Sequence, residues 1–89
     1  MERAKIKVTG DVQGVYYRFS AKMKAEELGL TGFAENESDD SVLVVVEGEA
    51  EKIKAFLRWL EVGPPMAEVE NLEITKEKYS GEYKEFEVR

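Results

Sequence analysis

The residues with the clearest chemical potential lie together between Gly10 and Arg18. The segment reads Gly10-Asp11-Val12-Gln13-Gly14-Val15-Tyr16-Tyr17-Arg18 and joins a predicted strand to a predicted helix. Backbone N–H groups in such a loop and at a helix start can surround an anion. Gly14 lets the backbone approach a phosphate, and Arg18 adds a planar charged fork for two phosphate oxygens. The spacing alone fits a small phosphate site and equally a simple turn with an exposed arginine.

The absence of cysteine and histidine excludes several kinds of site. With no Cys and no His, the chain cannot form a disulfide, a Cys/His zinc site, a thiol nucleophile or an imidazole base. Asp39 and Asp40 are adjacent, but no further ligands follow at the spacing of a chelating loop. A polar turn explains them better. We therefore expect no metal and no cofactor.

Composition limits the partners and the compartment. The 89 residues carry 19 acidic and 13 basic side chains, for a net charge of −6, which disfavours broad binding to nucleic acid or anionic membrane. The longest apolar run, residues 42–46, is too short to span a bilayer. Residues 1–5 lack the apolar core of a signal peptide. We expect a cytoplasmic monomer, and abundant Glu and Lys without Cys also fits a heat-adapted source.

The periodicity of apolar residues predicts one domain over residues 1–89. Strict alternation predicts strands, and spacings of three and four residues predict helices. The strands are expected at 4–10, 31–36, 42–47, 69–76 and 86–88, and the helices from about 18 to 28 and over 49–61. The order βαββαβ plus a short fifth strand predicts an α+β, ferredoxin-like sandwich, with an antiparallel sheet and two helices on one face.

Several local signals refine this prediction. The strand at 42–47 is apolar on both faces and should lie inside the sheet. Gly29 is placed to end the first helix in a left-handed conformation, with Leu30 supplying an apolar contact. The apolar phase breaks between Val69 and Leu72, which suggests a bulge. Residues 76–84 are expected to form a solvated turn between edge strands.

The same loop resembles the first signature of the acylphosphatase family, G-x-V-Q-G-V-x-F-R. A second family signature is similar to Gly32-Phe33-Ala34-Glu35-Asn36, followed by Val42 and Gly48 at the family's spacing. Leu28-Gly29-Leu30 and Gly63-Pro64 also resemble the family. The resemblance spans essentially the whole chain, and the family's fold is the ferredoxin-like plan reached above.

The resemblance implies hydrolysis of the carboxyl–phosphate bond of an acyl phosphate to a carboxylate and inorganic phosphate, without a metal. Arg18 would bind the substrate phosphate and Asn36 would position the attacking water. The backbone of the loop would cradle the phosphate at Val12, Gln13, Gly14, Val15, Tyr16, Tyr17 and Arg18. This chemistry suits the composition, because a carboxylate leaving group has a conjugate acid of pKa about 4 and departs without a general acid.

Three positions depart from the family pattern. Tyr17 stands where Phe is usual, so its hydroxyl needs a partner. Glu35 stands where a basic or neutral residue is common. Strand alternation puts Glu35 on the side of Phe33 and opposite Asn36. We therefore expect its negative charge to weaken the electrostatic field at the site without blocking the site. Asp40 replaces a turn glycine and should tolerate left-handed geometry.

Two other functions are compatible with the residues alone. The first is a ferredoxin-like module that binds an anion without turning it over, which would need Arg18 and the loop but not Asn36. The second is an RNA-binding module in which Tyr16 and Tyr17 stack on bases. The tyrosines lie in a loop and the chain is acidic, which disfavours that reading. The physiological acyl group is left open by the sequence.

Overall fold

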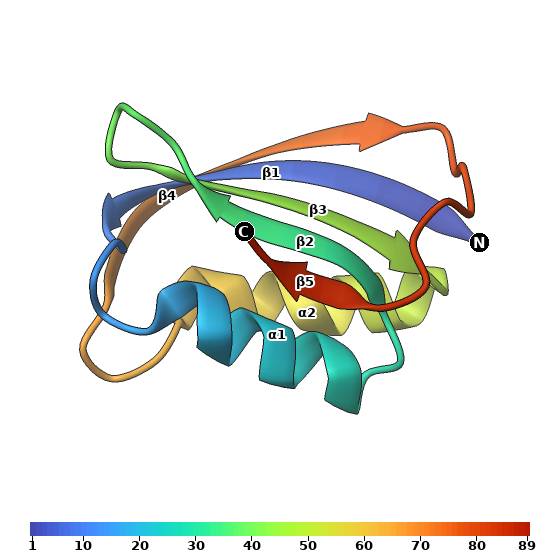
Figure 1. Cartoon of the computed structure of the whole chain (residues 1–89), viewed down its shortest axis with the longest axis horizontal. Helices are drawn as coiled ribbons and strands as arrows, with labels where there is room; N and C mark the ends of the chain where they lie inside the picture. Colours follow the sequence, from blue (N-terminus) through green and yellow to red (C-terminus); the bar gives the residue numbers. More distant parts are fainter.

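Five strands and two helices follow one another in the predicted order (Figure 1). The computed structural model describes residues 1–89. The elements are β1 (Glu2–Asp11), α1 (Tyr17–Glu27), β2 (Thr31–Asn36), β3 (Val42–Gly48), α2 (Ala50–Val62), β4 (Glu68–Glu77) and β5 (Phe86–Val88). The predicted bounds of β2 and β5 are the same, and those of the other elements differ by one or two residues. Neither helix is long and apolar enough to cross a membrane.

The strands form one sheet with the order β4-β1-β3-β2-β5. β3 lies between β1 and β2, as its two apolar faces predicted. The pairs β1–β3, β1–β4 and β2–β3 are antiparallel, but β5 pairs in parallel with β2. The four strands of the βαββαβ order form the predicted antiparallel sheet, and the short fifth strand, whose direction was not predicted, makes the whole sheet mixed. After β4 the chain reverses direction, but it does not pair with β4. It crosses to the opposite edge of the sheet and pairs with β2, which runs in the same direction as β5.

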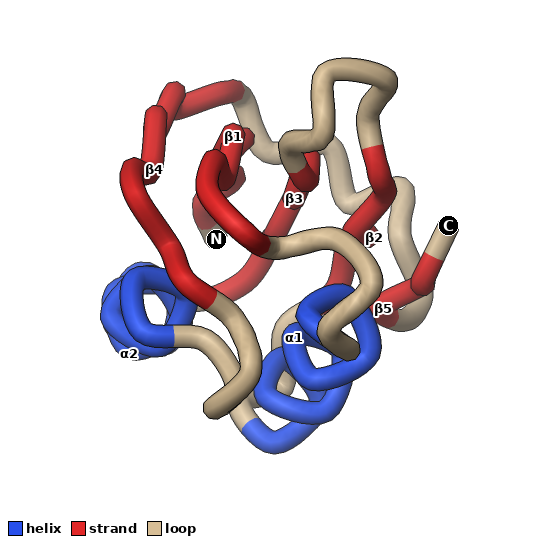
Figure 2. The backbone as a smooth tube through the Cα atoms, turned by 90° about the vertical axis from the view of Figure 1, so that its left-hand side faces the viewer, coloured by secondary structure: helices blue, strands red, loops and turns tan.

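Both helices cover one face of the sheet and leave the other face open (Figure 2). The core lies between the two layers, because alternate strand residues and one stripe of each helix point into it. Removal of these apolar side chains from water is the main stabilising term of the fold. The buried cluster includes Ile6, Val8, Val42, Val44, Val46, Ala21, Ala25, Ile53, Phe56, Leu60 and Phe86.

The end of α1 follows the predicted turn chemistry. Gly29 has φ 71°, a left-handed conformation. This turn lets the Leu30 N–H donate to the Ala25 carbonyl at 2.8 Å, which satisfies a carbonyl at the helix end. Leu30 is buried. The chain therefore leaves α1 in the direction that starts β2.

The expected irregularity in β4 is a bulge opposite β1. Thr9 pairs with Asn71 and Gly10 pairs with Val69, so Glu70 is the extra residue. An extra residue bends its strand and increases the local twist. This bend lies where β1 runs into the 12–18 segment.

The segment between β4 and β5 joins the two edge strands and is mostly exposed, as predicted, but it is also anchored to the sheet. The Glu47 side chain is only 1% exposed and accepts hydrogen bonds from the N–H and hydroxyl of Ser80, the N–H of Gly81 and the guanidinium of Arg3 at 2.9–3.1 Å. Arg3 also pairs with Glu82 at 2.9 Å. Burial by itself raises the pKa of the Glu47 carboxyl, but these donors outweigh burial and lower it. The segment that leads into β5 is thus fixed to the sheet.

Candidate functional site

The loop between β1 and α1 is held at both ends by buried side chains. Val12 and Tyr17 are each 1% exposed. The Tyr17 hydroxyl donates to the Leu60 carbonyl at 2.7 Å, so the hydroxyl that departs from the family pattern has its partner. Burial raises the pKa of Tyr17, which keeps the phenol neutral. A buried Tyr17 also cannot stack on a nucleobase.

The backbone amides of this loop have no acceptors within the chain. No N–H group from Val12 to Arg18 donates to a backbone or side-chain oxygen. Gly14 and Tyr16 have φ of 74° and 63°, and residues of alternating handedness turn successive N–H groups toward one side. A side chain at Gly14 would meet nothing within 4 Å, so the glycine is required for its backbone angle. The loop is a row of free donors that ends at a helix start.

Arg18 lies in the first turn of α1 and reaches across to the end of β5. Its guanidinium donates to the Arg89 carbonyl. The Arg89 N–H in turn donates to the Ala34 carbonyl of β2 at 2.8 Å. The end of β5 therefore connects Arg18 to the carboxyl end of β2. No Asp or Glu side chain lies within ion-pair distance of Arg18.

Asn36 is the last residue of β2, two positions beyond Ala34. Ala34 is buried under the helices, and alternation places Asn36 on that same face, with Glu35 on the other. Asn36 pairs with Val42 of β3. It is exposed, and its amide makes no hydrogen bond within the chain. The structure thus brings Asn36 to the edge of the sheet to which Arg18 extends.

The Gln13 side chain joins the loop to the β2–β3 hairpin. Its amide donates to the Glu37 carbonyl at 2.9 Å and to the Ser41 carbonyl at 2.8 Å. Glu37 directly follows Asn36, so this link fixes the loop relative to Asn36. The sequence assigned Gln13 only through its backbone. The only sequence signal for the side chain was that the family signature has a glutamine at this position. The two carbonyls that it binds are too distant in sequence to be predicted.

A hollow of about 330 Å³ lies beside the free amides. It is lined by Val12, Gly14, Tyr16, Tyr17, Arg18, Phe19 and Val88. Five of the predicted site residues are in this lining, whereas Gln13, Val15 and Asn36 are not. Gln13 faces a neighbouring hollow with Asp40. Phe19 and Val88 were not predicted, and β5 gave no sequence signal that it would return to this loop.

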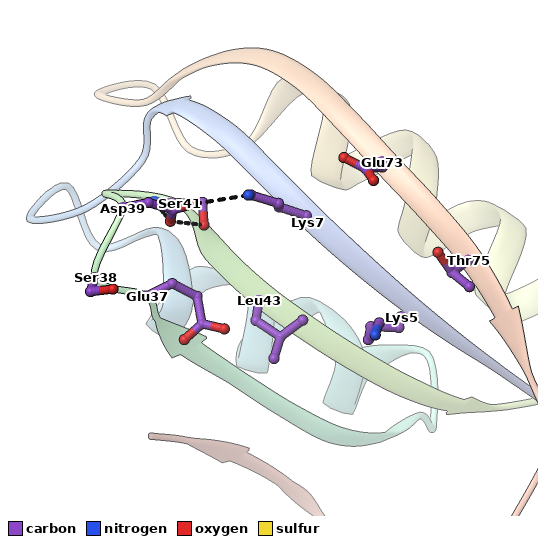
Figure 3. A pocket seen from close by; sticks show the side chains of 9 residues that line it. All are labelled: Lys5, Lys7, Glu37, Ser38, Asp39, Ser41, Leu43, Glu73 and Thr75. Carbon is purple, nitrogen blue, oxygen red and sulfur yellow. Dashed lines mark hydrogen bonds and ion pairs between the residues drawn. The ribbon is translucent and has the colours of Figure 1, made fainter.

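A second hollow lies on the open face of the sheet (Figure 3). Lys7 and Asp39 are its closest ion pair, at 2.8 Å. The hydrogen bond to Asp39 raises the pKa of Lys7, and the same bond, with those from Ser41, lowers the pKa of Asp39. Because the charges of Lys7 and Asp39 compensate each other, this hollow attracts an anion less strongly than the loop beside Arg18. Asp40 has φ 71°, so the hairpin keeps its left-handed residue.

Comparison with known proteins identifies the group to which this chain belongs. The family model described as Acylphosphatase matches residues 4–88. The acylphosphatase of Methylococcus capsulatus is 48% identical over 88 residues, which cover 99% of this chain and 96% of that protein.

Two solved structures agree over the whole fold. The crystal structure of acylphosphatase from Bacillus subtilis matches with a TM-score of 0.96 and 27% identity, over 100% of this chain and 99% of that chain. The acylphosphatase structure from Coxiella burnetii gives a TM-score of 0.92 and 40% identity, over 99% and 92% of the two chains.

The architecture is that of a ferredoxin-like α+β domain with a fifth strand, as these structures have it. The chain belongs to the acylphosphatase family. The expectation of an acyl phosphate hydrolase is confirmed at this level, and no comparison supports the anion-binding module without catalysis.

Proposed function

We propose that this chain hydrolyses acyl phosphates with the phosphoryl group held by the 12–18 backbone and Arg18, and with the attacking water oriented by Asn36. The observation that carries this proposal is the row of free N–H groups from Val12 to Arg18 beside a guanidinium that uses only one of its nitrogens within the chain. Amides in a fixed loop stabilise charge on phosphoryl oxygens without reorganising during the reaction.

The proposed reaction needs little covalent chemistry from the protein. The water oxygen bonds to phosphorus while the bond from phosphorus to the carboxylate oxygen breaks. The proton lost by water passes to a phosphate oxygen, because an amide such as that of Asn36 is too weak a base. The leaving carboxylate, with a conjugate acid of pKa about 4, needs no general acid. Positioning and charge stabilisation are then sufficient.

Arg18 suits the phosphate role because its donors are mostly free. A guanidinium has five N–H donors, and Arg18 uses one nitrogen for the Arg89 carbonyl. That contact holds the side chain in the lining of the hollow and leaves the other donors for phosphate oxygens. No Asp or Glu side chain competes for them.

Asn36 suits the water role because its amide is exposed, unbonded and held in place from both sides. Backbone pairing with Val42 fixes its strand position, and Gln13 fixes the following residue. A water that donates an O–H to the amide oxygen keeps its lone pairs free, and one of them can attack phosphorus.

The test compares four variants on acetyl phosphate with chelator present. Arg18→Ala should lower kcat/KM at least about 100-fold and weaken inhibition by inorganic phosphate. Asn36→Ala should lower kcat about 100-fold with little change in KM. Lys22→Ala on α1 and Asn71→Ala on β4 are matched controls away from the loop. Parent turnover in Asn36→Ala would exclude its role, and parent phosphate inhibition in Arg18→Ala would exclude the phosphate site.

We also propose that the chain acts as a cytoplasmic monomer without nucleic-acid or membrane partners. The net charge of −6 supports this, since it opposes association with polyanions. Sedimentation at working concentration tests the monomer. The proposed heat-adapted source predicts a melting temperature above the mesophilic range of about 45–65 °C.

A further inference from the structure

Three exposed apolar side chains gather beside Arg18. Tyr16, Phe19 and Val88 are 79%, 56% and 40% exposed. They come from the loop, the first turn of α1 and the end of β5, and all three line the hollow of about 330 Å³ next to the free amides. Elements far apart in the sequence therefore build one apolar wall.

The fold itself does not require this wall. None of the three side chains belongs to the buried core. Single exposed apolar residues are common on protein surfaces, but a group that converges on one hollow points to a ligand. The other exposed large apolar side chains, such as Met23 and Ile74, lie elsewhere and do not line this hollow.

The wall lies directly against the guanidinium. Phe19 follows Arg18 in the chain, and Val88 precedes Arg89, whose carbonyl accepts the hydrogen bond from Arg18. Arg18 is the only charged residue in the lining. A ligand that fits has an anionic group at the guanidinium and an apolar group beside it. A charged or hydroxyl-rich substituent would lose water there without gaining a partner, which is costly.

We propose that Tyr16, Phe19 and Val88 form a subsite for the acyl substituent, which selects acyl phosphates carrying an aromatic or branched aliphatic group over acetyl phosphate. This inference rests on the proposed function, because it assumes that the phosphate occupies the adjacent loop. The subsite would act by removing the apolar part of the substrate from water.

The experiment measures kcat/KM for benzoyl phosphate and acetyl phosphate in the parent, in Phe19→Ala and in Met23→Ala. Met23 is the matched control, since it lies one turn further along α1 and is 57% exposed. The parent should favour benzoyl phosphate by about tenfold or more, and Phe19→Ala should reduce this ratio about tenfold. Met23→Ala should keep the parent ratio.

A binding measurement without turnover supplies the second readout. The non-hydrolysable analogues phenacylphosphonate and acetonylphosphonate should inhibit the parent with the same order of preference, and Phe19→Ala should reduce that preference. Circular dichroism and sedimentation establish that each variant is folded and monomeric.

Three results would overturn the subsite. They are a parent ratio near one, an equal loss on both substrates in Phe19→Ala, or a change of oligomeric state in that variant, which would assign the wall to contacts between copies of the chain. Failure of the proposed function looks different, because Arg18→Ala would then retain activity on both substrates.

Discussion

The Gln13 side chain is the only one that joins the loop to the β2–β3 hairpin by hydrogen bonds, and Gln13→Leu tests what this link does. Leucine has a similar volume but no donor, so the bonds to the Glu37 and Ser41 carbonyls are lost. Both carbonyls keep another donor, the Asp40 N–H at 3.2 Å and the Glu37 N–H at 2.9 Å. No carbonyl is left unpaired, so the free energy of unfolding should fall by only about 1–3 kcal/mol for the two lost bonds.

The effect on catalysis should exceed the effect on stability. Asn36 precedes Glu37, so the loss of the link lets the Asn36 amide, which we propose to position water, shift relative to the loop. Because a misplacement of about 1 Å can cost about 100-fold, we expect kcat to fall about 10- to 100-fold while KM changes less than about threefold. Urea unfolding and steady-state kinetics on acetyl phosphate measure the two effects, with Lys22→Ala as the control.

Gln13→Glu separates positioning from a general loss of structure. The introduced carboxylate would face two carbonyl oxygens, which raises its pKa. The protonated form can donate one hydrogen bond, so stability and relative kcat should be higher at low pH and should be lost as pH rises through the raised pKa. Parent kcat in a folded but destabilised Gln13→Leu protein would refute the positioning role.

Two further substitutions test the packing that supports the site. Glu47→Gln should destabilise the fold by about 2–4 kcal/mol at neutral pH, because an amide cannot accept from all of the Ser80 and Gly81 donors. Because the pKa of Glu47 is lowered in the fold, its contribution to the free energy of unfolding is present above the ordinary pKa of 4.5 and is lost as pH falls. The melting temperatures of parent and variant should therefore converge in acid. A difference between them that stays constant with pH would contradict this account. Tyr17→Phe should cost about 1–3 kcal/mol, because the Leu60 carbonyl loses its hydroxyl partner inside the protein; an unchanged urea midpoint would show that this carbonyl is satisfied in another way.

Local signals in the sequence were enough to predict most of the fold. Gly29 ends α1 in the left-handed conformation, and the phase break before Leu72 is a bulge. In both cases the information lies within a few neighbouring residues. The backbone loop at 12–18 was predicted for the same reason, because a glycine-containing strand-to-helix turn is a local pattern.

Features that depend on distant partners were missed. Gln13 bonds to carbonyls 24 and 28 residues away, and nothing in its neighbourhood indicates them. Glu47 has the sequence context of an ordinary polar residue at a strand end, yet its donors at Ser80 and Gly81 lie 33 and 34 residues further along. The parallel pairing of β5 with β2 likewise depends on where the anchored segment carries the chain.

The direction of β5 decides which residues meet the loop at 12–18. A strand parallel to β2 finishes at the edge where β2 finishes, so Val88 and Arg89 arrive beside Arg18. A strand of opposite polarity would bring its first residues there and send its last carbonyl to the far end of the molecule. The last strand is therefore a part of the proposed acyl subsite, and changes in the segment between β4 and β5 should alter substrate preference without altering any residue of the two family signatures.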